Sequence, residues 1–164
     1  MNAIDRDQLK AVLDAARIKK RLQRELRFVP EEITDWEQRD FLAVTTKSGK
    51  EGALLYDGFV LPFSLSPRAA NASGRTEAII CDICATWRRG TESAAISFQK
   101  SATNSLTYLV CTGLDCSLHV RNLTKAATLS RTQLREHLDD ADRIERLRAR
   151  LNAICRHAAP DKML

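Results

Sequence analysis

Apolar residues recur at helical spacing near the start of the chain, where neither Gly nor Pro occurs between residues 5 and 27. Steps of three and four residues place them on one side of a helix. The apolar positions are Leu9, Val12, Leu13, Ala16, Ile18, Leu22 and Leu26. They predict one amphipathic helix, which Pro30 brings to an end because proline cannot continue an α-helix.

The remaining faces of this predicted helix are strongly basic. Such a stripe is compatible with RNA or with a membrane surface, but we prefer the solvated face of an amphipathic helix as its interpretation. The basic positions are Arg17, Lys19, Lys20, Arg21, Arg24 and Arg27.

A β-rich zone follows the helix. Apolar runs at residues 41–46 and 52–56 flank a turn-forming segment, and Asp57-Gly58 leads from the second run into residues 59–63. Asp-Gly between apolar runs is a strong hairpin signal, because the tight turn needs positive φ and these residues tolerate it. The pattern predicts a three-stranded antiparallel meander.

Two more strands and a helical zone are predicted towards the C-terminus. Apolar runs at 94–100 and 106–111, joined by a polar stretch, predict a β-hairpin. Helix is predicted from about Cys116, and again over 143–158, where an apolar stripe recurs. This stripe consists of Ile144, Leu147, Leu151, Ile154, Cys155 and Ala158. Cys155 is therefore expected to be a small buried residue of the core.

Composition indicates one ordinary globular domain. The chain has 164 residues, of which 44% are hydrophobic and 29% charged, and its net charge is +5. No apolar run reaches the roughly 18 to 20 residues needed to cross a bilayer, and the charged N-terminus lacks an apolar signal segment. We therefore expect a cytoplasmic protein that does not bind membranes. The modest positive charge favours an acidic partner, either protein or RNA.

Four of the five cysteines form two close pairs, Cys81 with Cys84 and Cys111 with Cys116. In a reducing compartment such pairs more often hold a metal ion than form disulfides. Zinc takes four thiolates in a tetrahedron, and two residues between cysteines let one tight turn offer both sulfurs to the same ion. A pair on a knuckle, then a β-hairpin, then a pair at a helix start is the treble-clef arrangement. We therefore predict one structural Zn²⁺ ion bound by these four cysteines.

Three alternatives to this site stay open. A zinc ribbon fits less well, because it has knuckles at both ends and no helix. A redox pair would lie between a strand and a helix of a βαβ unit, which the pattern does not contain. His119 lies three residues after Cys116 and could replace Cys111 as a ligand, although a buried cysteine that ends a strand would then lack a role.

Five segments carry a resemblance to a known family. They are Asp35-Trp36, RDFLAV (39–44), YDGFVLPFSLSP (56–67), CDIC (81–84) and CTGLDCSLHVRNL (111–123). Together they resemble the C-terminal treble-clef zinc finger of the elongation factor G-binding proteins, the family of the fusidic acid resistance proteins, from about residue 35 to about residue 157. The resemblance implies the same four zinc ligands. It also implies a translation-associated protein that docks on elongation factor G, the ribosomal translocase, and promotes its release from a stalled ribosome.

Partner contacts are expected on basic and aromatic side chains around the finger. An aromatic anchor ringed by arginines is typical of an interface hot spot. The candidates are Arg88, Arg89, Tyr108, His119 and Arg121, each of which could instead be a core residue or a solvated one.

The sequence thus predicts an α+β fold with an N-terminal amphipathic helix over 1–30 and a zinc-finger domain over 31–164. The predicted activity is binding to elongation factor G or the ribosome, and the alternative is a ribosomal RNA or nucleic-acid-binding zinc-finger protein. We expect neither catalysis nor a small-molecule substrate, because no phosphate loop or nucleophile elbow occurs. The acidic residues between 139 and 145 are expected to cap a helix rather than to form a catalytic pair.

Overall fold

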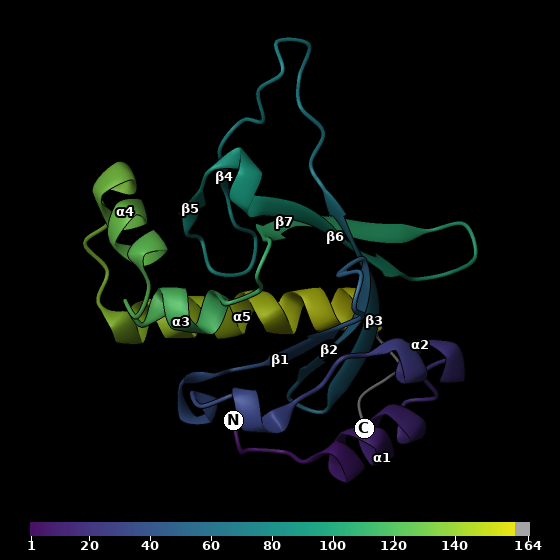
Figure 1. The fold of residues 1–164 in the computed structure, drawn as a ribbon. Helices are drawn as coiled ribbons and strands as arrows, with labels where there is room; N and C mark the ends of the chain where they lie inside the picture. Colours follow the sequence, from purple (N-terminus) through teal and green to yellow (C-terminus); the bar gives the residue numbers. More distant parts are fainter. Residues whose placement is uncertain (160–164) are drawn as a thin grey trace. The chain divides into compact units, whose positions relative to one another are not determined.

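The structure, a computed structural model, describes residues 1–159, which form five α-helices and seven strands (Figure 1). The strands pair in antiparallel fashion, and the predicted α+β class is confirmed. The chain divides into two compact units. Of the described residues, the first comprises 1–65, 97–106 and 155–159, and the second comprises 66–96 and 107–154. The predicted domain boundary after residue 30 stays a prediction, because a compact unit need not be an independently folding domain.

Two helices replace the single N-terminal helix that the apolar pattern predicts. α1 (Arg6–Ala15) begins after Asp5, whose carboxylate accepts a hydrogen bond from the Gln8 backbone N–H at 2.8 Å, while the Gln8 side chain accepts one from the Asp5 N–H at 2.9 Å. The helix ends because Arg17 takes the left-handed conformation, with φ of 55°. α2 (Lys20–Glu25) follows the break.

Five strands form one sheet in the order β1-β2-β3-β6-β7. Their bounds are β1 (Leu42–Thr45), β2 (Glu51–Tyr56), β3 (Phe59–Pro67), β6 (Ser93–Gln99) and β7 (Ser105–Cys111). The predicted meander is present, since β2 pairs with both β1 and β3. Between β2 and β3, Asp57 and Gly58 have φ of 44° and 78°, the positive values that the Asp-Gly signal predicts.

The first unit has a hydrophobic core between its helices and one face of the sheet. Each large aliphatic side chain buried there contributes about 1.5–3 kcal/mol. The core consists of Leu9, Leu13, Ile18, Leu22, Leu42, Val44, Ala53, Leu55 and Val60. The break between α1 and α2 is what allows both helices to bury their leucines in this one core.

The second unit contains a two-stranded ribbon and helices. β4 (Ile79–Ile80) pairs with β5 (Trp87–Arg88), and α3 (Cys116–Val120), α4 (Lys125–Leu134) and α5 (Asp140–Ala158) follow along the chain. The helix starting at Cys116 and the C-terminal helix are those predicted from the sequence. Short 3-10 helices occur in both units: η1 (Pro30–Glu32) and η2 (Trp36–Gln38) in the first, and η3 (Gly90–Glu92) in the second.

The apolar pattern gave no indication of α4. This helix buries only Ala127 and Ser130, so it lacks the leucine stripe by which amphipathic helices are detected. Its start is fixed by Thr124, whose hydroxyl accepts a hydrogen bond from the Ala127 N–H at 3.1 Å. At α5, the Asp139 carboxylate accepts a hydrogen bond from the Asp142 N–H at 2.8 Å, as the predicted capping role requires.

Gly52 on β2 leaves no room for a side chain. A Cβ at this position would lie 2.4 Å from the Val44 carbonyl oxygen and 2.5 Å from the Phe63 ring. Gly52→Ala should therefore lower the free energy of unfolding by about 1–3 kcal/mol, the usual cost of overpacking a core. Chemical denaturation followed by circular dichroism measures this change. The control Lys50→Ala, at an exposed position nearby, should stay within about 0.5 kcal/mol of wild type. Equal stability of Gly52→Ala and wild type would contradict this close packing.

Candidate metal centre

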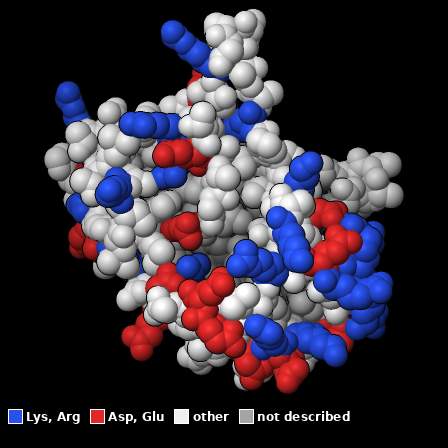
Figure 2. All heavy atoms as spheres, in the orientation of Figure 1, with Lys and Arg blue, Asp and Glu red and all other residues white. Residues whose placement is uncertain are grey.

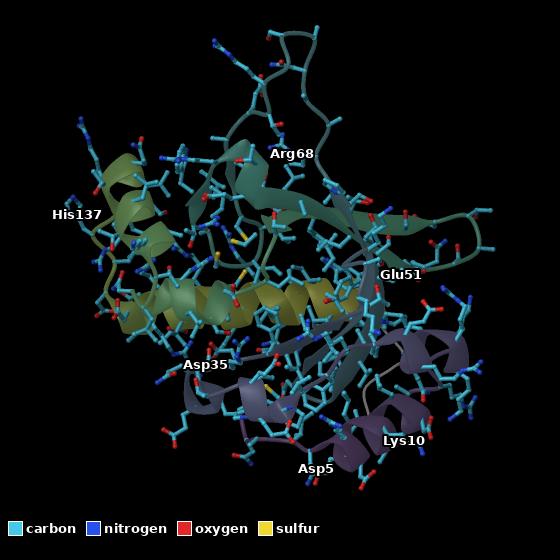
Figure 3. The ribbon with its side chains drawn as sticks, viewed as in Figure 1. Asp5, Lys10, Asp35, Glu51, Arg68 and His137 are labelled. Atoms are coloured by element: carbon cyan, nitrogen blue, oxygen red, sulfur yellow. The ribbon has the colours of Figure 1, made fainter. Side chains whose placement is uncertain are left out.

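Four cysteine side chains of the second unit converge on one point, and their sulfur atoms, yellow in Figure 3, all lie within 4.8 Å of one another. The Sγ atoms of Cys81 and Cys116 are 3.8 Å apart, and those of Cys84 and Cys111 are 3.7 Å apart. Sulfur atoms about 2.3 Å from a tetrahedral zinc ion are about 3.8 Å from one another, so these separations fit Zn²⁺. All four residues are buried. The centre is a structural zinc site, as the cysteine spacing predicts.

The first pair lies on a tight turn between β4 and β5. The Cys81 N–H donates to the Thr86 carbonyl at 3.0 Å, and the Ala85 N–H donates to the Cys81 carbonyl at 2.9 Å. Ala85 takes the left-handed conformation, with φ of 57°, which reverses the chain. Because of this reversal, Cys81 and Cys84 reach the same ion.

The second pair joins the end of a strand to the start of a helix. Cys111 is the last residue of β7, and Cys116 is the first residue of α3. Between them Leu114 is left-handed, with φ of 54°, and its N–H donates to the Cys111 carbonyl at 3.0 Å. The order of knuckle, hairpin and helix is the predicted treble clef.

Hydrogen bonds connect the knuckle with β7 and α5. The Asp82 N–H donates to the Leu109 carbonyl at 2.8 Å, and the Leu109 N–H donates to the Asp82 carboxylate at 2.6 Å. On α5, the Arg150 guanidinium donates to the Cys81 carbonyl at 3.1 Å. These bonds hold the knuckle close to the strand that carries Cys111.

Four cysteine thiols this close together can all ionise only if a cation balances their negative charge. Burial opposes ionisation of Cys81, yet hydrogen bonds from Cys111, Cys116 and Cys84 hold its pKa well below the usual value. Hydrogen bonds with Cys111, Cys81 and Cys84, together with burial, raise the pKa of Cys116 well above the usual value. The thiols alone therefore stabilise a thiolate at Cys81 at the expense of one at Cys116. A bound Zn²⁺ supplies the positive charge that lets all four sulfurs deprotonate.

His119 is buried and lies outside the ligand group. Its Nδ1 atom is 2.8 Å from the Thr124 hydroxyl oxygen. Burial, and then the nearby positive charge of Arg88, lowers the pKa of His119 to about 4, so its ring is neutral at physiological pH. Within residues 1–159 the ligand group consists of cysteines alone, which favours Cys111 over His119 as the fourth ligand.

Cys155 takes no part in the centre. This cysteine is fully buried, with 0% of its surface exposed, and burial raises the pKa of its thiol to about 12. The expectation of a small buried core residue is confirmed.

The predicted partner-binding residues differ in exposure. Arg89 is exposed, whereas Arg88, Tyr108 and Arg121 are partly buried. Arg88 is paired with a carboxylate at 3.5 Å, and Arg121 donates to a backbone carbonyl at 3.0 Å. His119 is 5% exposed and offers little surface for a partner to contact. Whether these five residues bind a partner stays a prediction.

Sequence reasoning missed an apolar spot beside the knuckle. Ile80 is 52% exposed and is the direct cross-strand partner of Trp87, which is partly exposed. Directly opposed residues of an antiparallel pair lie on the same face, so Ile80 and Trp87 form an accessible unit, called the ribbon pair below. Strands of two residues show no alternation, so no periodic signal in the sequence could have revealed it.

A buried arginine anchors α5 to the helix that carries Cys116. Arg143 is 1% exposed, and its guanidinium donates to the His119 carbonyl at 3.1 Å and to the Asn122 amide oxygen at 2.7 Å. The Glu136 carboxylate lies 3.4 Å from it and balances its charge. Charges this deeply buried need such partners, and the resulting network fixes the end of α3.

The cysteine centre has a counterpart in a known group of zinc fingers. A family model described as FBP C-terminal treble-clef zinc-finger matches residues 16–157, most of the chain. This match confirms the resemblance identified from the sequence. Neither the curated proteins nor the solved structures gave a significant match. In the described part of the chain, no helix has both the length and the apolar composition needed to span a membrane.

Zinc content should depend on the four clustered cysteines and not on Cys155. Cys84→Ala deletes one ligand and should release the metal. Structural zinc contributes an apparent binding free energy of about 10–16 kcal/mol to small modules, so its loss should also unfold the second unit. Atomic emission spectroscopy of the desalted protein, together with circular dichroism, measures both effects.

Cys155→Ala is the matched control, because it deletes an equally buried thiol outside the centre. This variant and the wild type should each hold about one zinc ion per chain. Stoichiometric zinc in the Cys84→Ala protein would contradict the assignment of the ligands.

Proposed function

Because the chain belongs to the FBP C-terminal treble-clef zinc-finger family, we propose that it is a translation-associated binding protein whose partner is elongation factor G. The resemblance to the fusidic acid resistance proteins supports this partner, and promoting release of the stalled factor from the ribosome is the proposed action. The observation that carries the proposal is the accessible ribbon pair beside a zinc centre.

The ribbon pair has the composition of an interface anchor. Tryptophan is enriched among the residues that dominate binding energy, and an adjacent aliphatic side chain enlarges the surface that a partner would cover. The Trp87 N–H donates to the Ser130 hydroxyl of α4 at 2.8 Å, which holds the backbone of β5 in place. A preorganised anchor loses little conformational entropy on binding, which favours affinity.

An exposed arginine adjoins this anchor in the sequence. Arg89 follows β5, is exposed, and forms no salt bridge with any residue from 1 to 159. Tyr108 is partly accessible and is a further proposed contact, as is Arg88, whose side chain is 12% exposed and pairs with Glu92 at 3.5 Å. Guanidinium groups at the rim of an apolar anchor favour an acidic partner surface and speed its association.

We propose that this role involves binding without catalysis. Four protein thiolates occupy all four positions of a tetrahedral zinc ion. No position is left for the water or substrate that catalytic zinc requires. We therefore assign the protein no small-molecule substrate. A cytoplasmic location belongs to the same proposal, because the translocase acts on cytoplasmic ribosomes.

Binding to purified elongation factor G tests the proposal. Biolayer interferometry with the immobilised factor should detect the zinc-loaded protein at micromolar concentrations. Ile80→Ala and Arg89→Glu should each weaken binding about tenfold, which corresponds to about 1.4 kcal/mol.

Two matched controls lie elsewhere in the second unit. Leu123→Ala truncates an aliphatic side chain that is 56% exposed, and Arg75→Glu reverses the charge of an exposed arginine. Both should bind like the wild type. A wild-type protein that fails to bind at micromolar concentrations would refute the partner, whereas equal losses in test and control variants would refute the contact surface.

A further inference from the structure

The first unit carries positive side chains that take part in no salt bridge. Exposed Lys10, Arg17, Lys19 and Arg24, called the unpaired cations below, form no salt bridge within the described residues. Figure 2 shows Lys and Arg side chains gathered over α2. The neighbouring basic residues are neutralised instead: Lys20 by Asp14, Arg21 by Glu25 and Glu51, and Arg27 by Glu32.

A groove of about 510 Å³ runs beside α2. Arg17 and Lys19 line it together with the ion pair of Arg21 and Glu51. Sheet residues that line it include Pro62, Ser64, Ser97 and Gln99. On β3, Ser64 lies on the same face as the buried core residue Val60, so the floor of the groove continues the sheet face that the helices cover. The groove therefore places hydroxyl and amide groups next to two cations.

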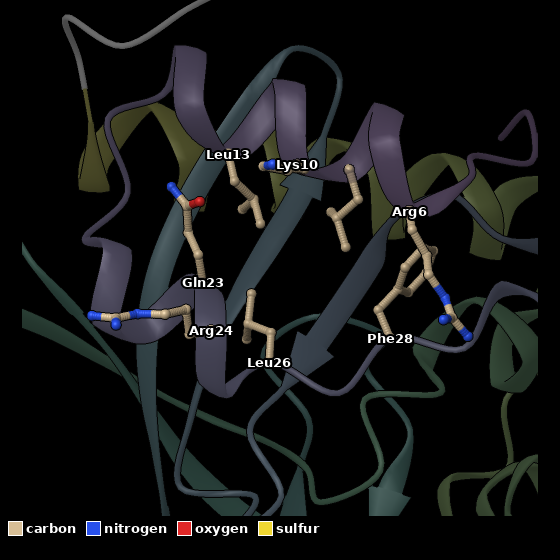
Figure 4. Close-up of a pocket in the computed structure, with 8 residues that line it drawn as sticks. Arg6, Lys10, Leu13, Gln23, Arg24, Leu26 and Phe28 are labelled. Atoms are coloured by element: carbon tan, nitrogen blue, oxygen red, sulfur yellow. The ribbon is translucent and has the colours of Figure 1, made fainter.

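α2 also borders a smaller hollow of about 290 Å³, which it shares with α1 (Figure 4). Lys10 and Arg24 line this hollow, and its apolar lining consists of Leu9, Leu13, Leu26 and Phe28. Ligand pockets usually measure about 300–1,000 Å³, so we assign this hollow no small molecule of its own. Unpaired cations therefore line both the groove and the hollow, and the positive surface extends across α2.

We propose that this basic surface binds the phosphodiester backbone of RNA without sequence preference. Arg and Lys neutralise phosphate oxygens, while Ser and Gln side chains hydrogen-bond to phosphate and sugar. Base stacking would need an accessible aromatic ring. Among the described residues, Phe63 is the one aromatic residue lining the groove, and it is buried. The groove therefore offers the bases no stacking platform, and the partly buried Phe28 ring lines only the smaller hollow.

The arrangement favours RNA over an acidic protein. Protein interfaces concentrate their energy in an accessible apolar or aromatic anchor, whereas the aromatic ring that lines the groove, Phe63, is buried. The unpaired cations are distributed over α1, the break that follows it and α2, which suits a polymer with one charge per repeat. This inference concerns the first unit and does not depend on elongation factor G binding by the second.

Fluorescence anisotropy with labelled poly-uridine RNA tests the proposal. The wild type should bind at low salt, and the logarithm of its affinity should fall linearly with the logarithm of salt concentration. The variant Arg17→Gln/Lys19→Gln/Arg24→Gln should reduce the steepness of this line by about 2, since each lost single-strand phosphate contact contributes about 0.7. Its affinity at about 50 mM salt should fall at least about tenfold.

A charge-matched control removes three exposed cations elsewhere, as Arg75→Gln/Lys125→Gln/Arg156→Gln. It should keep the wild-type salt dependence. Both triple variants should keep the wild-type zinc content and circular dichroism. Arg24→Gln alone, at an exposed helical position, should reduce the steepness of the line by about 0.7. This single variant still tests the proposal if the triple variant misfolds.

Three results would overturn the proposal. The first is a test variant with the wild-type salt dependence, and the second is an equal loss in the test and control variants. The third is tighter binding of poly-glutamate than of poly-uridine, which would identify an acidic protein as the ligand. Binding of elongation factor G by the Arg17→Gln/Lys19→Gln/Arg24→Gln protein is a separate measurement, so failure of this inference is distinguishable from failure of the proposed function.

Discussion

Repulsion among four buried thiolates is the constraint on which the second unit depends. Sulfur atoms 3.7 and 3.8 Å apart in a buried site cannot all carry negative charge unless a cation lies among them. The elements that bring the sulfurs together are short: β4 and β5 have two residues each, and α3 has five. Strands and helices of this length are not stable alone. Their geometry therefore depends on the metal and on the hydrogen bonds around it.

The two units are stabilised by different physical means. The first has an ordinary hydrophobic core of leucines and valines between helices and sheet, so it needs no metal ligand. The second also buries large apolar side chains, among them Ile96, Leu147 and Leu151, and adds the cysteine centre to them. This difference is reflected in their surfaces. The second unit presents an apolar pair followed by the exposed Arg89, whereas the first presents separate cations beside a groove.

The zinc ligands and the meander were predictable because their chemistry lies in adjacent residues. Cysteine spacing determines which thiols reach one ion, and Asp57-Gly58 determines where the strands reverse. The sequence did not reveal which basic side chains are neutralised by ion pairs, since Arg21 pairs with Glu51, a residue 30 positions away. The helix break at Arg17 was also hidden, because arginine gives no local signal for a left-handed backbone. The left-handed conformation of Arg17 follows from the burial of residues in both flanking helices. This burial depends on the folded core and cannot be seen in the local sequence.

Arg17 also shows that backbone stability and surface chemistry compete at a single position. A left-handed backbone costs a residue with a side chain about 1–2 kcal/mol, whereas glycine adopts it readily. With φ of 55°, position 17 would suit glycine on conformational grounds alone. A glycine there would relieve the strain but would remove the guanidinium beside the groove. Replacing Arg17 with glycine to raise thermal stability would therefore remove one positive charge from the surface. At this residue, a gain in thermal tolerance would come with a weaker attraction for polyanions.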